Sequence, residues 1–223
     1  METFLKKSRF FSQPVRVLIK REINFLVSEI KFSRVLDVGG GTGRHRSVFK
    51  GADEYIILDS DARVSPDVVG SAEQLPFNDS SFDCILCSEV LEHIKDPIAA
   101  IREIERVLNA GGNLILTVPF MNELHGEPFD FRRFTIFGLK ELFNEFPSLV
   151  IERILVRGNW NVTMWQFTTR ALIELANRKP ILGLPISQIC KLGTKLILLN
   201  YPNLSEDIAQ RFALGYSLRV KKL

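Results

Sequence analysis

Short apolar runs alternate with amphipathic segments along the first half of the chain. One apolar run begins at Val35, and others cover residues 55–58, 81–87 and 113–120. Short apolar runs bounded by turn residues are typical of buried strands. Because strands and helices alternate from Val35 to Phe120, we expect an α/β fold with a doubly wound, mostly parallel sheet and helices on both faces.

Amphipathic periodicity predicts three helices. In residues 98–112 the apolar side chains recur at spacings of three, four and one, which places them on one helix face, and Gly111 and Gly112 should end that helix. Two further helices are predicted at 163–177 and 185–200. They lie in a long apolar insertion, residues 159–210, between two late strands predicted at 149–156 and 212–220.

The densest local signal lies in residues 34–46, where an apolar strand ends in an acid and three alternating glycines follow. Without a Cβ atom, Gly39, Gly41 and Gly43 let the backbone turn sharply and approach a ligand closely. We expect a cofactor-binding turn from strand to helix, with Asp37 beside it. A dinucleotide fingerprint would need a further glycine where Arg44 or Arg46 stands, so that cofactor class is excluded.

The remaining pattern, D-x-G-x-G-x-G, resembles motif I of the class I S-adenosylmethionine-dependent methyltransferases. A glycine-rich turn that binds no ligand is the alternative. The resemblance implies S-adenosylmethionine as cofactor. It also implies that the methionine end is held by four residues of this turn, namely Asp37, Gly39, Gly41 and Gly43.

The next strand supports this interpretation. It runs into Asp59, sixteen positions after Gly43, where a carboxylate can accept hydrogen bonds from a ribose diol. Asp61 is the nearby competitor for that role.

Further on, residues 71–77 read S-A-E-Q-L-P-F and are similar to the D-A-x-x-L-P-F segment of type 11 methyltransferases. The resemblance implies that Ser71, Ala72 and Glu73 lie beside the adenine. Because Ser71 replaces the family's acid with an uncharged hydroxyl, we expect weaker binding. Cys87, Ser88 and Glu89 should form the floor of the pocket.

The family fold implies a seven-stranded, Rossmann-like sheet with an antiparallel edge strand and a helical insertion before the last strand. We expect a single methyltransferase domain over residues 1–223. Its predicted parts are a basic helical arm (1–33), a cofactor-binding core (34–158), the insertion (159–210) and the last strand (211–223).

Three histidines are available for acid-base chemistry, and His125 is the candidate catalytic base for a hydroxyl acceptor. It lies in residues 122–135, whose H-x-x-P-x-D-x-x-R pattern resembles methyltransferases that tailor sugars and polysaccharides. The acid and arginines of this segment either contact the substrate or brace the loop. His93 is expected to pack or to cap a turn.

The sequence indicates the methyl acceptor less directly than the cofactor, because the loops and not the sheet determine which substrate binds. A hydroxyl of a sugar or of a lipid-linked glycan precursor is the first expectation, from the resemblance of residues 122–135. An apolar metabolite of the quinone or polyketide type is the alternative, because the insertion is apolar. A third is a non-catalytic scaffold or partner subunit with a cofactor site weakened at Ser71.

Cysteine spacing adds no further chemistry. Cys84 and Cys87 lie three apart on one predicted strand, so their side chains point to opposite faces and should be core residues. Cys190 is isolated, and no metal site or disulfide is predicted. The first residues lack a sustained apolar core, so we expect no signal peptide and a cytoplasmic location.

Charge is unevenly distributed. Residues 1–34 carry eight Lys or Arg against three Glu, a local +5, whereas the rest carries 21 against 23, or −2. The arm is either a lid helix with a solvated basic face or a contact for an anionic membrane surface. A net charge of +3 does not favour nucleic acid as a partner. The insertion could lie on a membrane, cover an acceptor, form a homodimer contact or simply pack.

Overall fold

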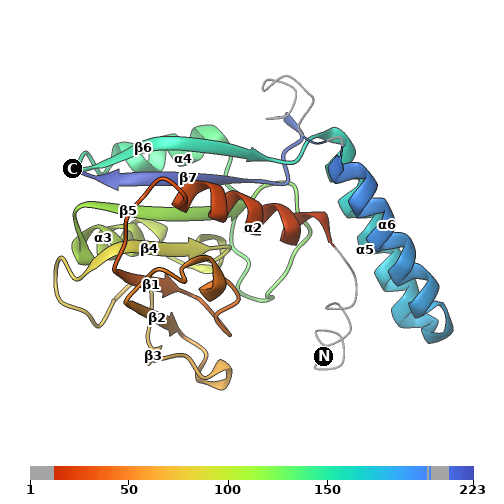
Figure 1. The fold of residues 1–223 in the computed structure, drawn as a ribbon, viewed down its shortest axis with the longest axis horizontal. Helices are drawn as coiled ribbons and strands as arrows, with labels where there is room; N and C mark the ends of the chain where they lie inside the picture. Colours follow the sequence, from red (N-terminus) through yellow and green to blue (C-terminus); the bar gives the residue numbers. More distant parts are fainter. Residues whose placement is uncertain (1–12, 200, 202–210) are drawn as a thin grey trace. The chain divides into compact units, whose positions relative to one another are not determined.

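The computed structural model describes residues 13–199, 201 and 211–223. Seven strands form one sheet in the order β3-β2-β1-β4-β5-β7-β6 (Figure 1). Strands β1 to β5 pair in parallel, and β7 runs antiparallel to β5. The strands are β1 (Arg34–Val38), β2 (Glu54–Asp59), β3 (Val68–Val69), β4 (Phe82–Ser88), β5 (Leu108–Pro119), β6 (Leu149–Arg157) and β7 (Gly215–Lys222). The predicted doubly wound, mostly parallel sheet is confirmed, with β6 rather than the last strand at the edge.

Five α-helices and four short 3₁₀ helices connect the strands in the described part of the chain. The α-helices are α2 (Pro14–Val27), α3 (Pro97–Val107), α4 (Ile136–Asn144), α5 (Trp160–Arg178) and α6 (Gly183–Leu199). The 3₁₀ helices are η1 (Arg46–Val48), η2 (Ala62–Val64), η3 (Leu91–His93) and η4 (Pro180–Leu182). None of the helices among the described residues is both long and apolar enough to cross a bilayer.

Helix α3 shows how the sequence sets its boundaries. Asp96 caps the helix by accepting a hydrogen bond from the backbone N–H of Ala99, and Pro97 occupies the first turn. The helix ends at Val107, earlier than predicted, because residues 108–112 already belong to β5. Here the pairing with β4 shifts register, and Gly111 adopts φ +76°, so the two glycines form an irregularity in the strand instead of a helix end.

The helix expected directly after the glycine turn does not form. Only the 3₁₀ turn η1 lies between β1 and β2. Only the short stretch from Arg44 to Gly51 is available before β2 begins at Glu54, and helices this short are marginal without strong packing. Phe49 covers the sheet there instead: it is buried and packs between the rings of Phe32 and Tyr55, at centroid distances of 5.3 and 5.6 Å.

The chain separates into two compact units. The sheet unit comprises residues 22–155 and 215–223, and the hairpin unit comprises residues 1–21 and 156–214. This division lies within what the sequence predicted as one domain. Residues 1–12 of the predicted basic arm and residues 202–210 of the insertion lie outside the described residues.

In the sheet unit, apolar strands are covered on both faces. Ser217 and Arg219 alternate on β7 and reach the C-terminal half of α2, where Ser217 donates to Glu22 and Arg219 to the carbonyl of Leu26. Helices α3 and α4 lie behind the sheet in Figure 1. Cys84 and Cys87 on the central strand β4 are fully buried core residues, and burial raises the pKa of both thiols.

In the hairpin unit, α5 and α6 lie side by side (Figure 1). Trp165 Nε1 donates to Thr194 Oγ1 over 3.0 Å. Close approach requires Gly193, because a Cβ atom there would lie 2.1 Å from the Trp165 ring. The predicted helices at 163–177 and 185–200 therefore correspond to α5 and α6.

Candidate functional site

The glycine turn lies at the carboxyl end of β1, as predicted. Gly39, Gly41 and Gly43 have φ values of +67°, +54° and +70°, a region that favours glycine. A Cβ atom added to Gly39 would lie 2.5 Å from the Val90 side chain. One added to Gly43 would lie 2.6 Å from the Ile57 side chain. The two outer glycines therefore allow close packing, and Gly41 is the one with open space around it.

Asp37 lies beneath this turn and is buried, with 1% of its surface exposed. Its Oδ2 accepts a hydrogen bond of 2.5 Å from the hydroxyl of Tyr55. Burial, only partly offset by that bond, raises the pKa of Asp37 to about 7. A carboxyl group whose burial is so poorly compensated would be stabilised in its charged form by a cationic ligand.

Two residues missed at the sequence level hold Asp37 in place. A Cβ atom on Gly40 would lie 2.6 Å from Asp37 Oδ2, so the carboxylate occupies the space that Gly40 leaves empty. Gly40 could have been noticed as the additional glycine in V-G-G-G-T-G, whereas nothing local marked Tyr55, which comes from the next strand.

Asp59 lies beside the turn, as expected for the ribose position. Its Oδ2 accepts the backbone N–H of Gly41 over 2.9 Å, and its Oδ1 accepts the N–H of Asp61. The competitor Asp61 instead pairs with exposed Arg63, whose hydrogen bonds lower the pKa of Asp61. The structure thus brings Asp59, and not Asp61, to the glycines.

The segment expected at the adenine begins next to Asp59, because the N–H of Gly70 donates to the Asp59 carbonyl. Ser71 Oγ accepts the N–H of Glu73, and Glu73 Oε1 accepts the N–H of Asp96. Ser71 thus stabilises its own turn, Glu73 holds the start of α3, and Ala72 is buried.

The predicted floor of the site ends β4. Cys87 is buried and pairs in register with Val38 of β1. Ser88 Oγ lies 3.0 Å from Thr117 Oγ1 of β5, and the Thr117 hydroxyl donates a hydrogen bond to the Glu89 carboxylate. Glu89 has φ +55°, unusual outside glycine, and such backbone strain is often found at functional sites.

The loop of residues 122–135 is braced from within. Arg133 makes two ion-pair contacts to Asp130, at 2.5 and 2.7 Å, and they lower the pKa of Asp130 to about 2. Arg132 donates to the carbonyls of Ile94 and Lys95. The sequence left open whether these charged residues contact the substrate or brace the loop, and the contacts fit bracing.

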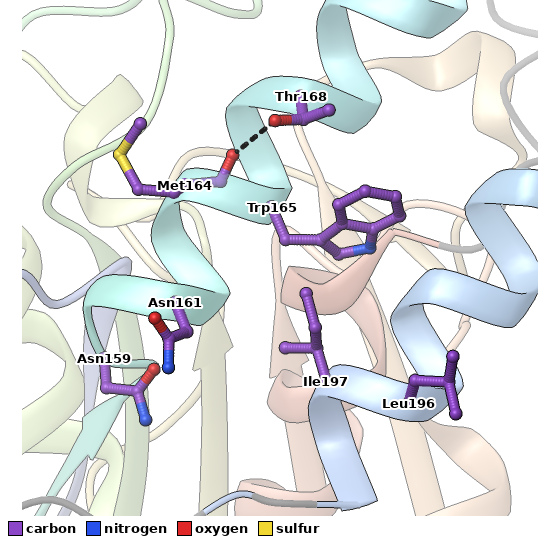
Figure 2. A pocket seen from close by; sticks show the side chains of 7 residues that line it. All are labelled: Asn159, Asn161, Met164, Trp165, Thr168, Leu196 and Ile197. Atoms are coloured by element: carbon purple, nitrogen blue, oxygen red, sulfur yellow. Dashed lines mark hydrogen bonds between the residues drawn. The ribbon is translucent and has the colours of Figure 1, made fainter.

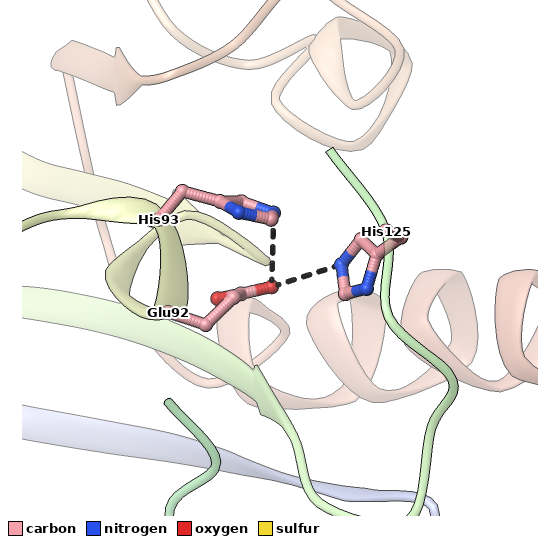
Figure 3. Close-up of side chains that lie close together, drawn as sticks. All are labelled: Glu92, His93 and His125. Carbon is pink, nitrogen blue, oxygen red and sulfur yellow. Dashed lines mark ion pairs between the residues drawn. The ribbon is translucent and has the colours of Figure 1, made fainter. Parts of the chain in front are cut away.

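This loop carries His125 to two residues of η3, as Figure 3 shows. His125 Nε2 lies 3.4 Å and His93 Nε2 3.6 Å from the same oxygen, Oε1 of Glu92. Glu92 is fully buried, which raises its pKa, and its carboxylate raises the pKa of His125. We call these three residues the Glu92 cluster. Glu92 was not anticipated, since its partner His125 is far away along the chain.

A separate cavity of about 460 Å³ lies in the hairpin unit (Figure 2). Its wall combines the start of α5 with the end of α6: Asn159, Asn161, Met164, Trp165, Thr168, Leu196 and Ile197. The mixture of amide and apolar side chains can accommodate a ligand with both polar and apolar parts.

Residues 36–116 match a family described as a methyltransferase domain. An uncharacterized protein of Methanocaldococcus jannaschii is 34% identical over 107 residues, which cover 46% of this chain and 52% of that protein. The ubiquinone/menaquinone biosynthesis C-methyltransferase of Vibrio cholerae is 38% identical over 103 residues, 37% of this chain and 40% of that enzyme. The chain thus spans about half, or less, of the length of these curated relatives.

The structure of the [4+2]-cyclase SpnF superposes with a TM-score of 0.60 at 23% identity, covering 91% of this chain and 80% of that one. At this identity the similarity establishes the fold alone. Residues 36–116 thus match a methyltransferase domain, and the glycine turn and the site residues around it lie within or beside this matched region. The methyl donor of the matched family is S-adenosylmethionine.

Proposed function

We propose that this protein transfers a methyl group from S-adenosylmethionine to a hydroxyl of a small-molecule or glycan acceptor. The observation that carries the proposal is the contact between Gly41 and Asp59. It joins the open glycine of the turn at β1 to an acid at the end of β2. In doubly wound sheets, ligands bind outside the carboxyl ends of the strands.

The residues at this position fit the cofactor. Asp37 offers a buried carboxylate for the ammonium group, and its pKa of about 7 shows that burial outweighs the hydrogen bond from Tyr55 and the charges of Arg44 and Arg46. Gly41 leaves space where a Cβ atom would meet only Asp59 Oδ2, 4.0 Å away. We assign Asp37 and the glycines to the methionine end, Asp59 to the ribose, Ser71 to Glu73 to the adenine side, and Cys87 and Ser88 to the floor. When bound, the cofactor supplies an electrophilic methyl group.

For the acceptor we propose a hydroxyl of a sugar or of a lipid-linked glycan precursor. A hydroxyl must lose its proton as it is methylated, and the Glu92 cluster with His125 offers acceptors for that proton. The sugar class rests on the resemblance of residues 122–135 to sugar-tailoring methyltransferases.

A quinone-type acceptor is the second candidate. It is favoured by the relative from Vibrio cholerae, which is named for ubiquinone and menaquinone biosynthesis. The apolar side chains exposed on the hairpin unit, among them Leu192 and Leu196, suit an apolar acceptor or a membrane surface. Contact with a membrane, a homodimer and a scaffold role remain predictions.

An acceptor assay distinguishes these candidates. The protein is incubated with S-adenosylmethionine labelled in the methyl group, together with sugar nucleotides, lipid-linked sugars or hydroquinones, and the products are identified by mass spectrometry. Label on a sugar oxygen supports the proposal, and label on a quinone ring carbon supports the second candidate. Cofactor binding without transfer to any hydroxyl acceptor would contradict the proposed reaction.

A further inference from the structure

The Glu92 cluster brings three hydrogen-bond acceptors together. The side chain of Glu92 is fully buried, and among the described residues neither of its oxygens accepts a hydrogen bond. A buried carboxylate without hydrogen bonds is costly. The Nε2 atoms of His93 and His125 lie 3.6 and 3.4 Å from its Oε1 atom.

The other ring nitrogens fix which histidine atoms carry hydrogen. His93 Nδ1 lies 2.7 Å from the carbonyl oxygen of Phe129, which can only accept, so Nδ1 donates. His125 Nδ1 lies 3.1 Å from the Glu123 carbonyl.

Arg133 Nη2 also approaches His125 Nδ1, at 3.5 Å. The two hydrogens of Arg133 Nη2 already point to the Glu123 carbonyl and to Asp130 Oδ2, at 2.9 and 2.7 Å. Arg133 therefore has no hydrogen left for His125 Nδ1, and this nitrogen donates to the Glu123 carbonyl. In its neutral form, each imidazole therefore directs an Nε2 lone pair toward Glu92.

We propose that Glu92, His93 and His125 form a binding site for a divalent transition metal ion of the Zn²⁺ type. Two imidazole nitrogens and one carboxylate oxygen are a frequent ligand set for such ions, with one coordination position left open. All three ligand atoms lie within 4.8 Å of one another. Metal–ligand bonds of about 2.0–2.1 Å separate tetrahedral ligands by roughly 3.3–3.5 Å, close to the 3.4 and 3.6 Å found here.

The surroundings support a metal rather than an incidental contact. Ligating histidines usually donate their second N–H to a carbonyl or carboxylate, as His93 and His125 do here. The nearby cation Arg133 lies on the Nδ1 side of His125 and is paired with Asp130.

Glycine allows the loop to approach the cluster. Gly126 has φ +70°, and a Cβ atom there would lie 2.9 Å from the His93 ring.

The role of the site rests on the proposed function. Val90, two residues before Glu92, packs against Gly39 of the cofactor turn. A metal ion bound there would hold the acceptor hydroxyl at its open coordination position and lower the pKa of that hydroxyl, so that the proton could pass to solvent water as the oxygen attacks the methyl group. His125 would then act as a metal ligand rather than as a free base. The substrate would be an acceptor whose hydroxyl group can coordinate the metal ion.

Metal titration tests the site without any need for turnover. Protein freed of metal by a chelator and exchanged into chelator-free buffer is titrated with ZnCl₂ by calorimetry and with CoCl₂ by visible absorption. We expect binding of one ion per chain and the strong absorption of tetrahedral Co²⁺. The variants His93→Ala, His125→Ala and Glu92→Gln should each lose at least roughly 100-fold in affinity, more than the ~10–100-fold typical of outer-shell changes.

His45→Gln is the matched control, since His45 lies outside the cluster, and it should bind as the wild type does. Glu92→Gln retains the side-chain shape, so its folding can be checked by thermal unfolding. Absence of 1:1 binding, or equal affinity in the cluster variants and the wild type, would overturn the proposal.

Cofactor binding is measured on the same protein with chelator present. If S-adenosylmethionine binds and Zn²⁺ does not, the metal inference fails while the proposed function stands. If Zn²⁺ binds to the cluster and S-adenosylmethionine does not bind, the metal site stands and the proposed function fails.

Discussion

At the scale of single residues, Asp37 is the central group of the candidate cofactor site. It is buried under the glycine turn and hydrogen-bonded to Tyr55, and its pKa is raised to about 7. The charged groups that act on it are Arg44, Arg46 and Asp59. Because the pKa in the folded state exceeds the ordinary value of 3.8, folding binds a proton between these two values, and stability falls as pH rises through that window.

Asp37→Asn should therefore stabilise the protein increasingly between about pH 4 and 7, with no further change above pH 7. Each pKa unit corresponds to ~1.36 kcal/mol, so a shift from 3.8 to about 7 should bring the gain to roughly 4 kcal/mol. Urea unfolding of both proteins from pH 4 to 8 measures it. A difference in stability that is the same at every pH would contradict the assignment. The same variant should bind S-adenosylmethionine more weakly.

Gly40 offers a second test at this scale. In Gly40→Ala the added Cβ atom would lie 2.6 Å from the Asp37 carboxylate and 2.9 Å from Ile57, so we expect a loss of about 1–3 kcal/mol in the free energy of unfolding. Gly51→Ala is the control, since no atom lies within 4 Å of its added Cβ. Equal stability of the two variants would show that the space at Gly40 is not needed.

At the scale of elements, the loop of residues 122–135 brings His125 to Glu92 and His93 of η3 and so completes the Glu92 cluster. The pair between Asp130 and Arg133 fixes the loop, and the N–H of Phe131 donates to the carbonyl of Glu92 in η3. The position of His125 therefore depends on contacts between two segments distant in sequence.

Gly126→Ala should push the loop away from His93 and lower turnover, while leaving cofactor affinity near that of the wild type. Gly111→Ala is a matched control, because Gly111 also has a positive φ (+76°) but no neighbour within 4 Å. Both variants carry the same kind of backbone strain, so only the contact with His93 differs. The comparison uses turnover alongside calorimetric cofactor affinity, and equal turnover in the two variants would contradict the role of the loop.

The hairpin of α5 and α6 is a second element with its own test. Gly193→Ala places a Cβ atom 2.1 Å from the Trp165 ring and should cost about 1–3 kcal/mol in hairpin stability. Gly183→Ala, which meets no atom within 4 Å, should leave the hairpin intact. Hydrogen exchange in residues 160–199 should rise only in Gly193→Ala, and cofactor binding should persist. Unchanged exchange would contradict the packing at Trp165.

At the scale of the whole molecule, the sequence predicted the sheet well because each parallel strand is a short, almost wholly apolar run. Strands β2 and β4 begin and end within a residue of the predicted positions. The glycine turn was also predictable, since its conformation depends on residues adjacent in the chain. The helix predicted after it from the glycine pattern was wrong, because only a 3₁₀ turn forms in the short segment before β2.

The candidate site was predictable where a motif or the end of a predicted strand marks its residues, as at Gly41 and Asp59. Tyr55 reaches Asp37 from a neighbouring strand, and Glu92 meets His125 from a loop more than thirty residues away. Periodicity and motifs describe neighbours in sequence, so contacts of this kind become visible only in the folded chain.

The central claim, an S-adenosylmethionine site at the glycine turn, is tested most directly by calorimetry. Purified protein is titrated with S-adenosylmethionine and with S-adenosylhomocysteine, and the titrations are repeated with Asp59→Ala. We predict saturable 1:1 binding of both ligands, weakened at least about tenfold in the variant through loss of hydrogen bonds to a charged group, worth ~1.5–3 kcal/mol. No detectable binding to the folded wild-type protein would contradict the account and favour a scaffold role.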